Sequence, residues 1–238
     1  MLMEDKMFCY KYPHAAVTTD SVVFGFDGRE LHILLIERGA EPYKGYWAIP
    51  GGFINMNETV EEGALRELKE ETAIDNIYLE QFHVFSAVDR DPRERVLTVA
   101  FFALVKKSEY NVIAGDDAVR AEWFPIAALP NLAFDHNDII VSAREHLQDR
   151  MRAKPIAFKL LDEKFTMTEL QTLFESVNDI TYDRRNFYRK IMATGYLKDC
   201  GPSPLTVHNR VPQLYSFDED AYMSGQNKKE SKRYPFDF

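Results

Sequence analysis

Three glutamates at helical spacing are the residues of this chain best placed to do chemistry. Glu67, Glu70 and Glu71 lie in the stretch from Gly51 to Ile74, GGFINMNETVEEGALRELKEETAI. On a helix of about 3.6 residues per turn they fall within an arc of about 100°. Like charges at this spacing repel each other, and a bound cation would relieve that repulsion. Hard oxygen ligands suit Mg²⁺, whose usual task in proteins is phosphate chemistry.

The helix that must carry these glutamates has recognisable start signals. Thr59 with Glu62 three residues later predicts a capping box, and Asn57 is the alternative cap. Leu65 and Leu68 point to another side of this helix and are expected to enter a core. Taken alone, the acidic face is equally what a solvated helix would show, because glutamate is a good helix former.

The full spacing of the stretch resembles the Nudix box. Gly52, Glu58 and the run Arg66–Ile74 (RELKEETAI) stand at the intervals of that signature. The resemblance implies an α/β fold, the Nudix α/β/α sandwich with a mixed sheet, in which the three glutamates bind a divalent metal. It also implies cleavage of nucleoside diphosphates linked to another group. Ala73 departs from the glycine of the pattern, at a cost of about 1 kcal/mol in a left-handed helix cap.

Composition bounds the class of protein. The chain has 238 residues and 45% hydrophobic residues, enough for one large or two modest globular domains. No apolar run approaches the roughly 18 residues of a membrane span, and the first ten residues lack the apolar segment of a signal peptide. The lack of such a run predicts no membrane partner, and Cys9 and Cys200, far apart in the sequence, suggest no disulfide framework and favour a reducing, cytoplasmic location.

The pattern around the glutamate stretch predicts strands, a second helix and a domain boundary. Ile139, Ala143, Leu147 and Met151 recur every four residues and predict that helix, and Pro155 ends it. The expected domains are residues 1–153, a Nudix-like effector-binding domain, 154–225, a winged helix DNA-binding domain, and 226–238, a polar tail whose end is expected to be disordered. The predicted strands are Asp20–Phe26, Leu31–Ile36, Tyr78–Val88, Val96–Val105 and Glu122–Pro125.

Effector-binding candidates lie near the loop that precedes the Nudix box. In Nudix proteins this loop helps to wall the ligand pocket, so Asp20, Arg38 and Trp47 are the predicted effector-binding residues. Trp47 would serve equally well as a partly buried structural anchor. His136 is expected to cap a helix or to make a structural hydrogen bond.

Charge separates the two halves of the chain. Residues 1–154 hold 17 basic and 26 acidic side chains, whereas residues 155–238 hold 12 of each. A net charge of −9 argues against nucleic acid at first, but the segment Arg184–Lys198 has five basic residues and no acidic one. In this half, Thr168–Gln171 predicts a capping box for one helix and Asp183 predicts the cap of the next. Residues 211–217 would then form the hairpin of a wing.

The second of these helices has the residues of a DNA-reading surface. Arginine and asparagine read guanine and adenine edges in the major groove, whereas lysine and tyrosine suit phosphate contacts. An ordinary helical subdomain with a solvated basic face is the alternative, because a helix-turn-helix lacks a fixed motif. The predicted DNA-binding residues are Arg184, Arg185, Asn186, Tyr188, Arg189 and Lys190.

A Nudix domain followed by FTMTELQTLFESV and DRRNFYRKI resembles the Nudix-related transcriptional regulators. The resemblance implies a homodimer that binds a double-stranded DNA operator without a cofactor and responds to a small effector. Members sense ADP-ribose or pentoses, and the arabinose regulators of Bacteroides-like bacteria are the type suggested. The alternative is a Mg²⁺-dependent hydrolase of ADP-ribose or a related nucleoside diphosphate derivative, with Arg66 in a structural pair with Glu58 or Glu62.

Overall fold

A computed structural model describes residues 10–75, 77–110, 112–115, 118–204, 211–226 and 234–237. Its first part is built on a mixed seven-stranded sheet. The central strand β1 (Ala16–Phe26) runs parallel to β6 (Val96–Lys106) over its whole length, and the other pairings are antiparallel. The remaining strands are β2 (Leu31–Arg38), β3 (Trp47–Ala48), β4 (Gly51–Phe53), β5 (Glu80–Phe85) and β7 (Ala118–Pro125).

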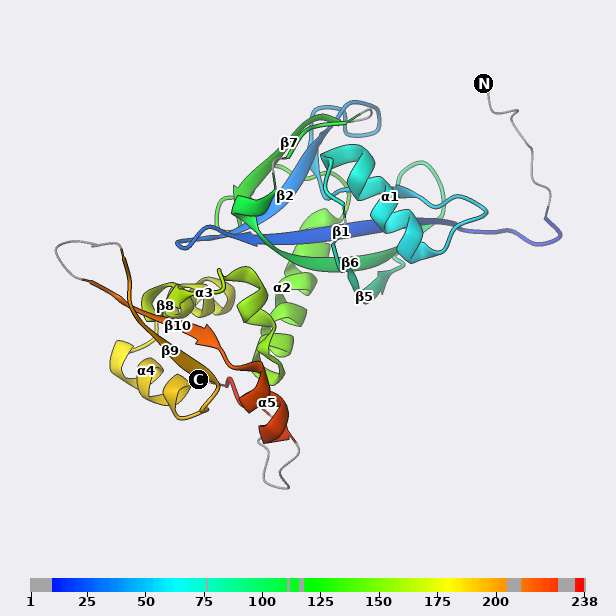
Figure 1. Cartoon of the computed structure of the whole chain (residues 1–238). Helices are drawn as coiled ribbons and strands as arrows, with labels where there is room; N and C mark the ends of the chain where they lie inside the picture. The colour runs from blue at the N-terminus through cyan, green and yellow to red at the C-terminus, as the bar shows by residue number, and fades with distance from the viewer. Residues whose placement is uncertain are drawn as a thin grey trace.

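Two helices cover opposite faces of this sheet (Figure 1), α1 (Val60–Thr72) and α2 (His136–Ala153). Successive side chains of a strand point to opposite faces. Accordingly, Phe24 packs in the cluster that contains the buried side of α2, and its neighbour Val23 packs in the cluster that contains Leu68 of α1. The predicted α/β/α sandwich with a mixed sheet is therefore confirmed.

Element ends differ from the prediction in a few places. Strand β5 is shorter than the predicted Tyr78–Val88, and β7 begins four residues before the predicted Glu122. Leu65 was expected in a core, but it is 39% exposed while Leu68 is buried. The buried side of α1 is thus narrower than predicted, because it includes only one of the two leucines.

The second part of the chain is a winged helix-turn-helix. Helix α3 (Met167–Asn178) is followed by α4 (Arg184–Met192), and a small sheet of order β8-β10-β9 completes the domain. The antiparallel pair β9–β10 is the predicted wing, and residues 205–210 at its tip lie outside the described residues. The other elements are 3₁₀ helices η1 (Lys107–Glu109) and η2 (Pro155–Leu160), strands β8 (Phe165–Thr166), β9 (Leu197–Pro202) and β10 (Gln213–Phe217), and helix α5 (Glu219–Gln226).

Capping residues define where α3 and α4 begin. The side chain of Asp183 accepts a hydrogen bond from the amide of Asn186 at 2.9 Å, as predicted. For α3 the predicted box at Thr168 is wrong. Thr166 is the cap and exchanges hydrogen bonds with Glu169, because the helix starts one residue after the β8 strand ends.

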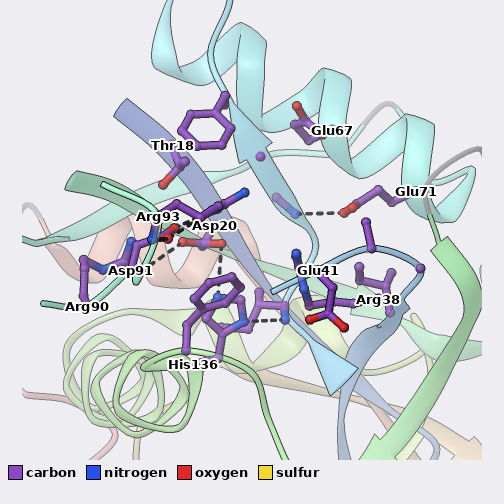
Figure 2. A pocket seen from close by; sticks show the side chains of 18 of the residues that line it. Thr18, Asp20, Arg38, Glu41, Glu67, Glu71, Arg90, Asp91, Arg93 and His136 are labelled. Atoms are coloured by element: carbon purple, nitrogen blue, oxygen red, sulfur yellow. Dashed lines mark hydrogen bonds and ion pairs between the residues drawn. The ribbon is translucent and has the colours of Figure 1, made fainter. Parts of the chain in front are cut away.

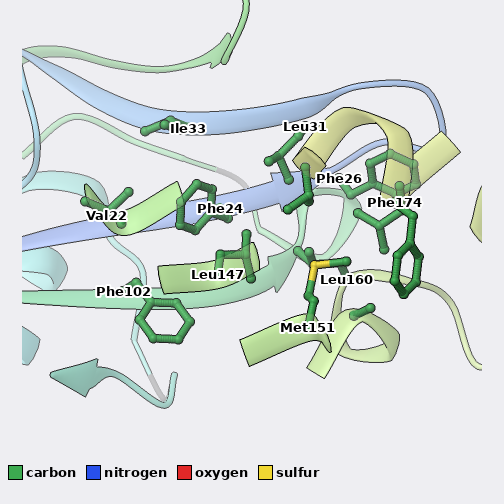
Figure 3. Packing of buried hydrophobic residues seen from close by; sticks show 14 of the residues in the cluster. Val22, Phe24, Phe26, Leu31, Ile33, Phe102, Leu147, Met151, Leu160 and Phe174 are labelled. Carbon is green, nitrogen blue, oxygen red and sulfur yellow. The ribbon is translucent and has the colours of Figure 1, made fainter. Parts of the chain in front are cut away.

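One hydrophobic cluster runs through both parts of the chain (Figure 3). It includes Phe24 of β1, Leu147 of α2, Leu160 of η2 and Phe174 of α3. Every residue in this cluster is at most 8% exposed. The winged helix is therefore packed directly on the first part of the chain, because its first helix contacts the middle of α2 and strand β2.

The C-terminal residues also join this cluster. Phe236 is 2% exposed and packs on Phe158, Tyr196 and Tyr222. Its amide donates to the carbonyl of Arg152 at 3.2 Å. The expected disorder at the end of the tail is therefore wrong for residues 234–237, because an aromatic ring there completes the core. Residues 227–233 lie outside the described part.

In the part of the chain that the structure describes, no helix is both long and apolar enough to cross a membrane.

Candidate effector pocket and nucleic-acid interface

The Nudix-box helix α1 begins and ends as its sequence indicates. Thr59 accepts from the amide of Glu62 at 3.2 Å, and the Glu62 carboxylate accepts from the Thr59 amide at 2.8 Å. Ala73 ends the helix in the left-handed region, with φ 60°. Gly52 lies against the helix so closely that a Cβ there would come within 2.6 Å of the Glu67 carboxylate. A larger residue at this position would push the Glu67 carboxylate out of its present place.

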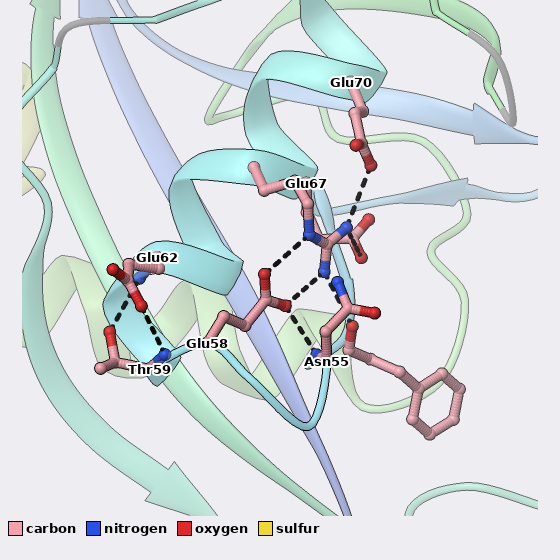
Figure 4. Close-up of polar contacts among 8 residues, drawn as sticks. Asn55, Glu58, Thr59, Glu62, Glu67 and Glu70 are labelled. Carbon is pink, nitrogen blue, oxygen red and sulfur yellow. Dashed lines mark hydrogen bonds and ion pairs between the residues drawn. The ribbon is translucent and has the colours of Figure 1, made fainter. Parts of the chain in front are cut away.

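Arg66 gathers the acidic side chains of the box into one network (Figure 4). Its guanidinium donates to Glu58 at 2.7 and 3.0 Å, to Glu67 at 2.8 Å and to Glu70 at 3.0 Å. The predicted structural pair with Glu58 is therefore present. The hydrogen bonds from Arg66 lower the pKa of Glu58 to about 2.

Glu71 is set apart from this network. It is buried, and one of its oxygens accepts from the amide of Gly51 at 2.9 Å. Burial raises the pKa of Glu71 to about 8, and burial also raises the pKa of Glu67. Glu71 is therefore largely protonated at neutral pH, the form that repels nearby anions least.

These carboxylates do not fit a metal centre as they are arranged. Glu67 and Glu70 accept hydrogen bonds from Arg66, and Glu71 accepts one from the Gly51 backbone amide. Among the residues that the structure describes, no group of three His, Cys, Asp or Glu side chains is placed to hold a metal ion. The Mg²⁺ site expected at Glu67, Glu70 and Glu71 would need Arg66 to withdraw, and no hydrolytic step follows from the present arrangement.

A pocket of about 400 Å³ opens beside this helix (Figure 2). The predicted residues Asp20 and Arg38 both line it. It also holds the aromatic side chains Phe53 and Phe134. Seven more charged residues line it, namely Glu41, Arg66, Glu67, Glu71, Arg90, Asp91 and Arg93.

Trp47, the third residue predicted to bind the effector, does not line this pocket. Its ring packs edge-on against Phe124 at 4.6 Å, and the Arg120 guanidinium covers it at 5.1 Å. Its backbone also pairs with the chain around Leu132. The alternative interpretation of Trp47 as a structural anchor is the one that the structure supports.

The pocket floor is formed where α2 begins. Arg90 is buried and donates two hydrogen bonds to Asp135, at 2.7 and 2.9 Å. His136 accepts from the amide of Ile49 at 2.9 Å through Nδ1, the structural hydrogen bond that was expected of it. Burial lowers the pKa of His136, so that it is neutral. Asp20 lies 3.7 Å from both Arg90 and His136.

Sequence reasoning missed Arg90, Arg93 and Phe134 as pocket residues. Both arginines lie in the charged loop between β5 and β6, which is evident in the sequence. The charges of this loop alone do not indicate which part of the protein it faces. The two hydrogen bonds from Arg90 to Asp135 join residues 45 positions apart. These two segments meet at the pocket only when the sheet and α2 have assembled.

Helix α4 presents a basic surface to solvent. Phe187 and Ile191 are buried against α3, so that the opposite side of the helix faces outward. The six residues predicted to bind DNA are all exposed, namely Arg184, Arg185, Asn186, Tyr188, Arg189 and Lys190. Within the described residues, no carboxylate lies within 4.0 Å of any of the four basic groups. Arg189 donates to Oδ1 of Asn186 at 3.0 Å.

Comparisons with known proteins agree with this two-part architecture. Residues 14–143 match the NUDIX domain family, and residues 157–217 match the NrtR DNA-binding winged helix domain. The chain thus joins a Nudix domain to a winged helix of the DNA-binding type.

Individual relatives extend over nearly the whole chain. The "ADPR responsive transcriptional repressor NtrR" of Acinetobacter baylyi is 34% identical over 210 residues, which are 87% of this chain and 83% of the relative. The crystal structure of Shewanella oneidensis NrtR with a 27mer DNA has a TM-score of 0.71 at 31% identity, covering 87% of this chain and 95% of that one. The chain belongs to the family of NrtR-type Nudix-related transcriptional regulators.

Two further relatives match the Nudix domain alone. The NUDIX domain of Shewanella oneidensis NrtR, in a cocrystal with ADP ribose, has a TM-score of 0.52 at 35% identity and covers 57% of this chain and 90% of that one. The "ADP-ribose pyrophosphatase" of Methanocaldococcus jannaschii is 44% identical over 129 residues, 54% of this chain and 73% of the relative.

Proposed function

We propose that this protein is a DNA-binding transcriptional repressor whose affinity for its operator changes when ADP-ribose occupies the Nudix pocket. The observation that carries the proposal is the basic outer side of α4. Helix α4 is the second helix of a winged helix-turn-helix, and it exposes four basic side chains that have no ion-pair partner in the described structure. A helix in this position enters the major groove of DNA.

The side chains of α4 divide into two roles in this proposal. Arg185, Asn186 and Arg189 face base edges, whereas Lys190 and Tyr188 contact phosphates. Asn186 would have to release its hydrogen bond from Arg189 to pair with an adenine through both atoms of its amide. In a homodimer, two such helices about 34 Å apart would read two half-sites on one face of DNA.

The choice of ADP-ribose rests on the relatives and on the pocket. One relative is named for its response to ADPR, and the Nudix domain of another was crystallised with ADP ribose. The pocket, of about 400 Å³, offers arginines for its phosphates and aromatic rings for its base. None of the relatives described above is a pentose regulator, so that a pentose such as arabinose has no support as the effector.

Fluorescence anisotropy with DNA from upstream of the gene tests DNA binding. Arg185→Ala and Arg189→Ala should each weaken binding by about tenfold or more, because each removes a bidentate base contact. Lys164→Ala removes an equally exposed cation just before β8 and should change affinity little. Equal binding by wild type and both arginine variants would refute the proposal, provided that their thermal unfolding is unchanged.

ADP-ribose hydrolysis is the second candidate, favoured by the 44% identity to the pyrophosphatase and by the complete set of box glutamates. Release of AMP from ADP-ribose with Mg²⁺ present, abolished in Glu70→Gln, would support it. Because Arg66 and the backbone occupy the three carboxylates, we expect this release to be slow or absent.

A further inference from the structure

Phe134 adopts a conformation that is rare for an aromatic residue. Its φ is 52°, in the left-handed region where only glycine is free of strain. Tyr43, with φ 64°, meets the Phe134 ring edge-on at a centroid distance of 4.8 Å. Backbone strain of this kind persists where the surroundings enforce it, and it concentrates at ligand sites. Here it directs the Phe134 ring into the effector pocket.

Arg38 lies against this ring, with its guanidinium carbon 4.9 Å from the ring centre. In the described structure its guanidinium makes one hydrogen bond, from Nε to the carbonyl oxygen of Pro42 at 2.9 Å. Both terminal nitrogens thus remain available for a ligand. Figure 2 shows Arg38 at the pocket beside Glu41, and yet no ion pair between them is formed.

The other arginines of the pocket are already neutralised. Arg66 is paired with Glu58, Arg90 with Asp135, and Arg93 with Asp91. No carboxylate of the described residues lies within 4.0 Å of the Arg38 guanidinium. Burial and the nearby Arg93 lower the pKa of Arg38, in keeping with a cation that has no carboxylate at ion-pair distance. A half-buried cation without a partner is costly unless an anion joins it.

We infer that Arg38, held in place by Phe134, receives a phosphate of the effector through its two terminal nitrogens. The planar guanidinium matches phosphate geometry with two parallel hydrogen bonds. This inference rests on the proposed function and explains how the pocket would distinguish one effector from another. A free pentose carries no anion and leaves Arg38 unpaired, whereas the diphosphate of ADP-ribose supplies one. Arg38 thereby selects a phosphorylated effector, and Phe134 is a positioning residue.

Isothermal titration of the full-length protein with ADP-ribose tests the inference. Arg38→Gln should bind about 10- to 100-fold more weakly than wild type, and Arg38→Lys should recover part of the loss because it keeps the charge. Phe134→Leu keeps apolar volume but removes the ring face and should cost about two- to fivefold. The matched control is Arg120→Gln, an arginine that also covers an aromatic ring but lies outside the pocket, and it should bind normally.

Salt dependence separates a phosphate contact from a structural role. Wild-type affinity should fall as NaCl rises from about 50 to 300 mM, and it should fall less in Arg38→Gln because one charged contact is gone. If wild type binds ADP-ribose and Arg38→Gln binds it within twofold with the same salt dependence, the inference is overturned and the proposed function stands. If wild type binds DNA but gives no heat with ADP-ribose, the proposed effector itself is wrong.

Discussion

Replacement of Arg144 by methionine should loosen the winged helix from the Nudix domain. Arg144 of α2 donates to the carbonyl of Val177 at 2.8 Å and to that of Ser176 at 2.9 Å, in the last turn of α3. Carbonyls in the last turn of a helix lack partners within the helix, so that α2 supplies them from outside. Gln148 adds a third hydrogen bond, to Val177 at 2.9 Å.

The expected loss follows from these contacts. Hydrogen bonds from a charged donor contribute about 1.5–3 kcal/mol each, but Val177 keeps its bond from Gln148 in the variant. We therefore expect a total loss of about 2–3 kcal/mol in the free energy of unfolding. For a chain of this length that corresponds to a fall of about 4–12 °C in Tm. Thermal unfolding followed by circular dichroism measures it.

The same variant should also weaken the response to effector. The first turn of α2 forms the pocket floor through His136, and its middle holds α3, so that one rigid helix joins both sites. In Arg144→Met, ADP-ribose and DNA should each bind nearly as in wild type. The ratio of operator affinities with and without ADP-ribose should move toward one, because the coupling free energy is reduced.

Glu145→Met provides the control, because Glu145 is exposed on the same helix and the same side chain is introduced. It should leave both Tm and the effector response unchanged. An Arg144→Met protein that unfolds within 1 °C of wild type and keeps the full ADP-ribose effect would show that these hydrogen bonds neither stabilise the domain pair nor couple it.

Three further changes concern stability and are measured by urea denaturation. The pKa of Glu71 is about 8 in the folded protein, whereas its ordinary value is 4.5. The contribution of Glu71 to folding stability is therefore fully present below about pH 4.5 and is lost as the pH rises through 8. Glu71→Gln should flatten that pH dependence, and an unchanged profile would contradict the assignment. Ala73→Gly should stabilise by about 0.5–1 kcal/mol, because φ 60° is free of strain for glycine, and a loss of stability would show that the cap is not left-handed. Phe236→Ala should cost about 3–5 kcal/mol, whereas Tyr234→Ala at an exposed position should cost much less; equal costs would argue against the buried ring.

Local signals explain why much of the fold was predictable. The Thr59–Glu62 box, the left-handed Ala73 and the Asp183 cap all act within a few residues, and the structure has each of them. The buried sides of α3 and α4 follow from helical periodicity in the same way. The misplaced cap at Thr168 shows the limit, because Thr166 offers the same spacing to Glu169 and only the end of β8 decides between them.

Contacts between distant segments could not be predicted in this way. Arg38 and Asp20 reach the pocket as expected, but the partners that define its chemistry, such as Arg90 with Asp135, meet only after the sheet has closed. Trp47 was expected in a loop but lies in the short strand β3, and its ring packs against Phe124 of strand β7. Phe236 follows a polar, basic run, and nothing in its neighbours indicates that the body of the protein has a place for its ring.

The hydrophobic cluster that spans both parts has a consequence for engineering. A foreign winged helix grafted after α2 would meet the side chains of Leu147 and Met151, which are shaped for the native α3 and η2. It would also lose the donors that Arg144 and Gln148 direct at one particular turn. Chimeras between regulators of this type should therefore also exchange the side chains of α2 that face α3, Arg144 and Gln148 first, while the rest of α2 stays matched to the Nudix sheet.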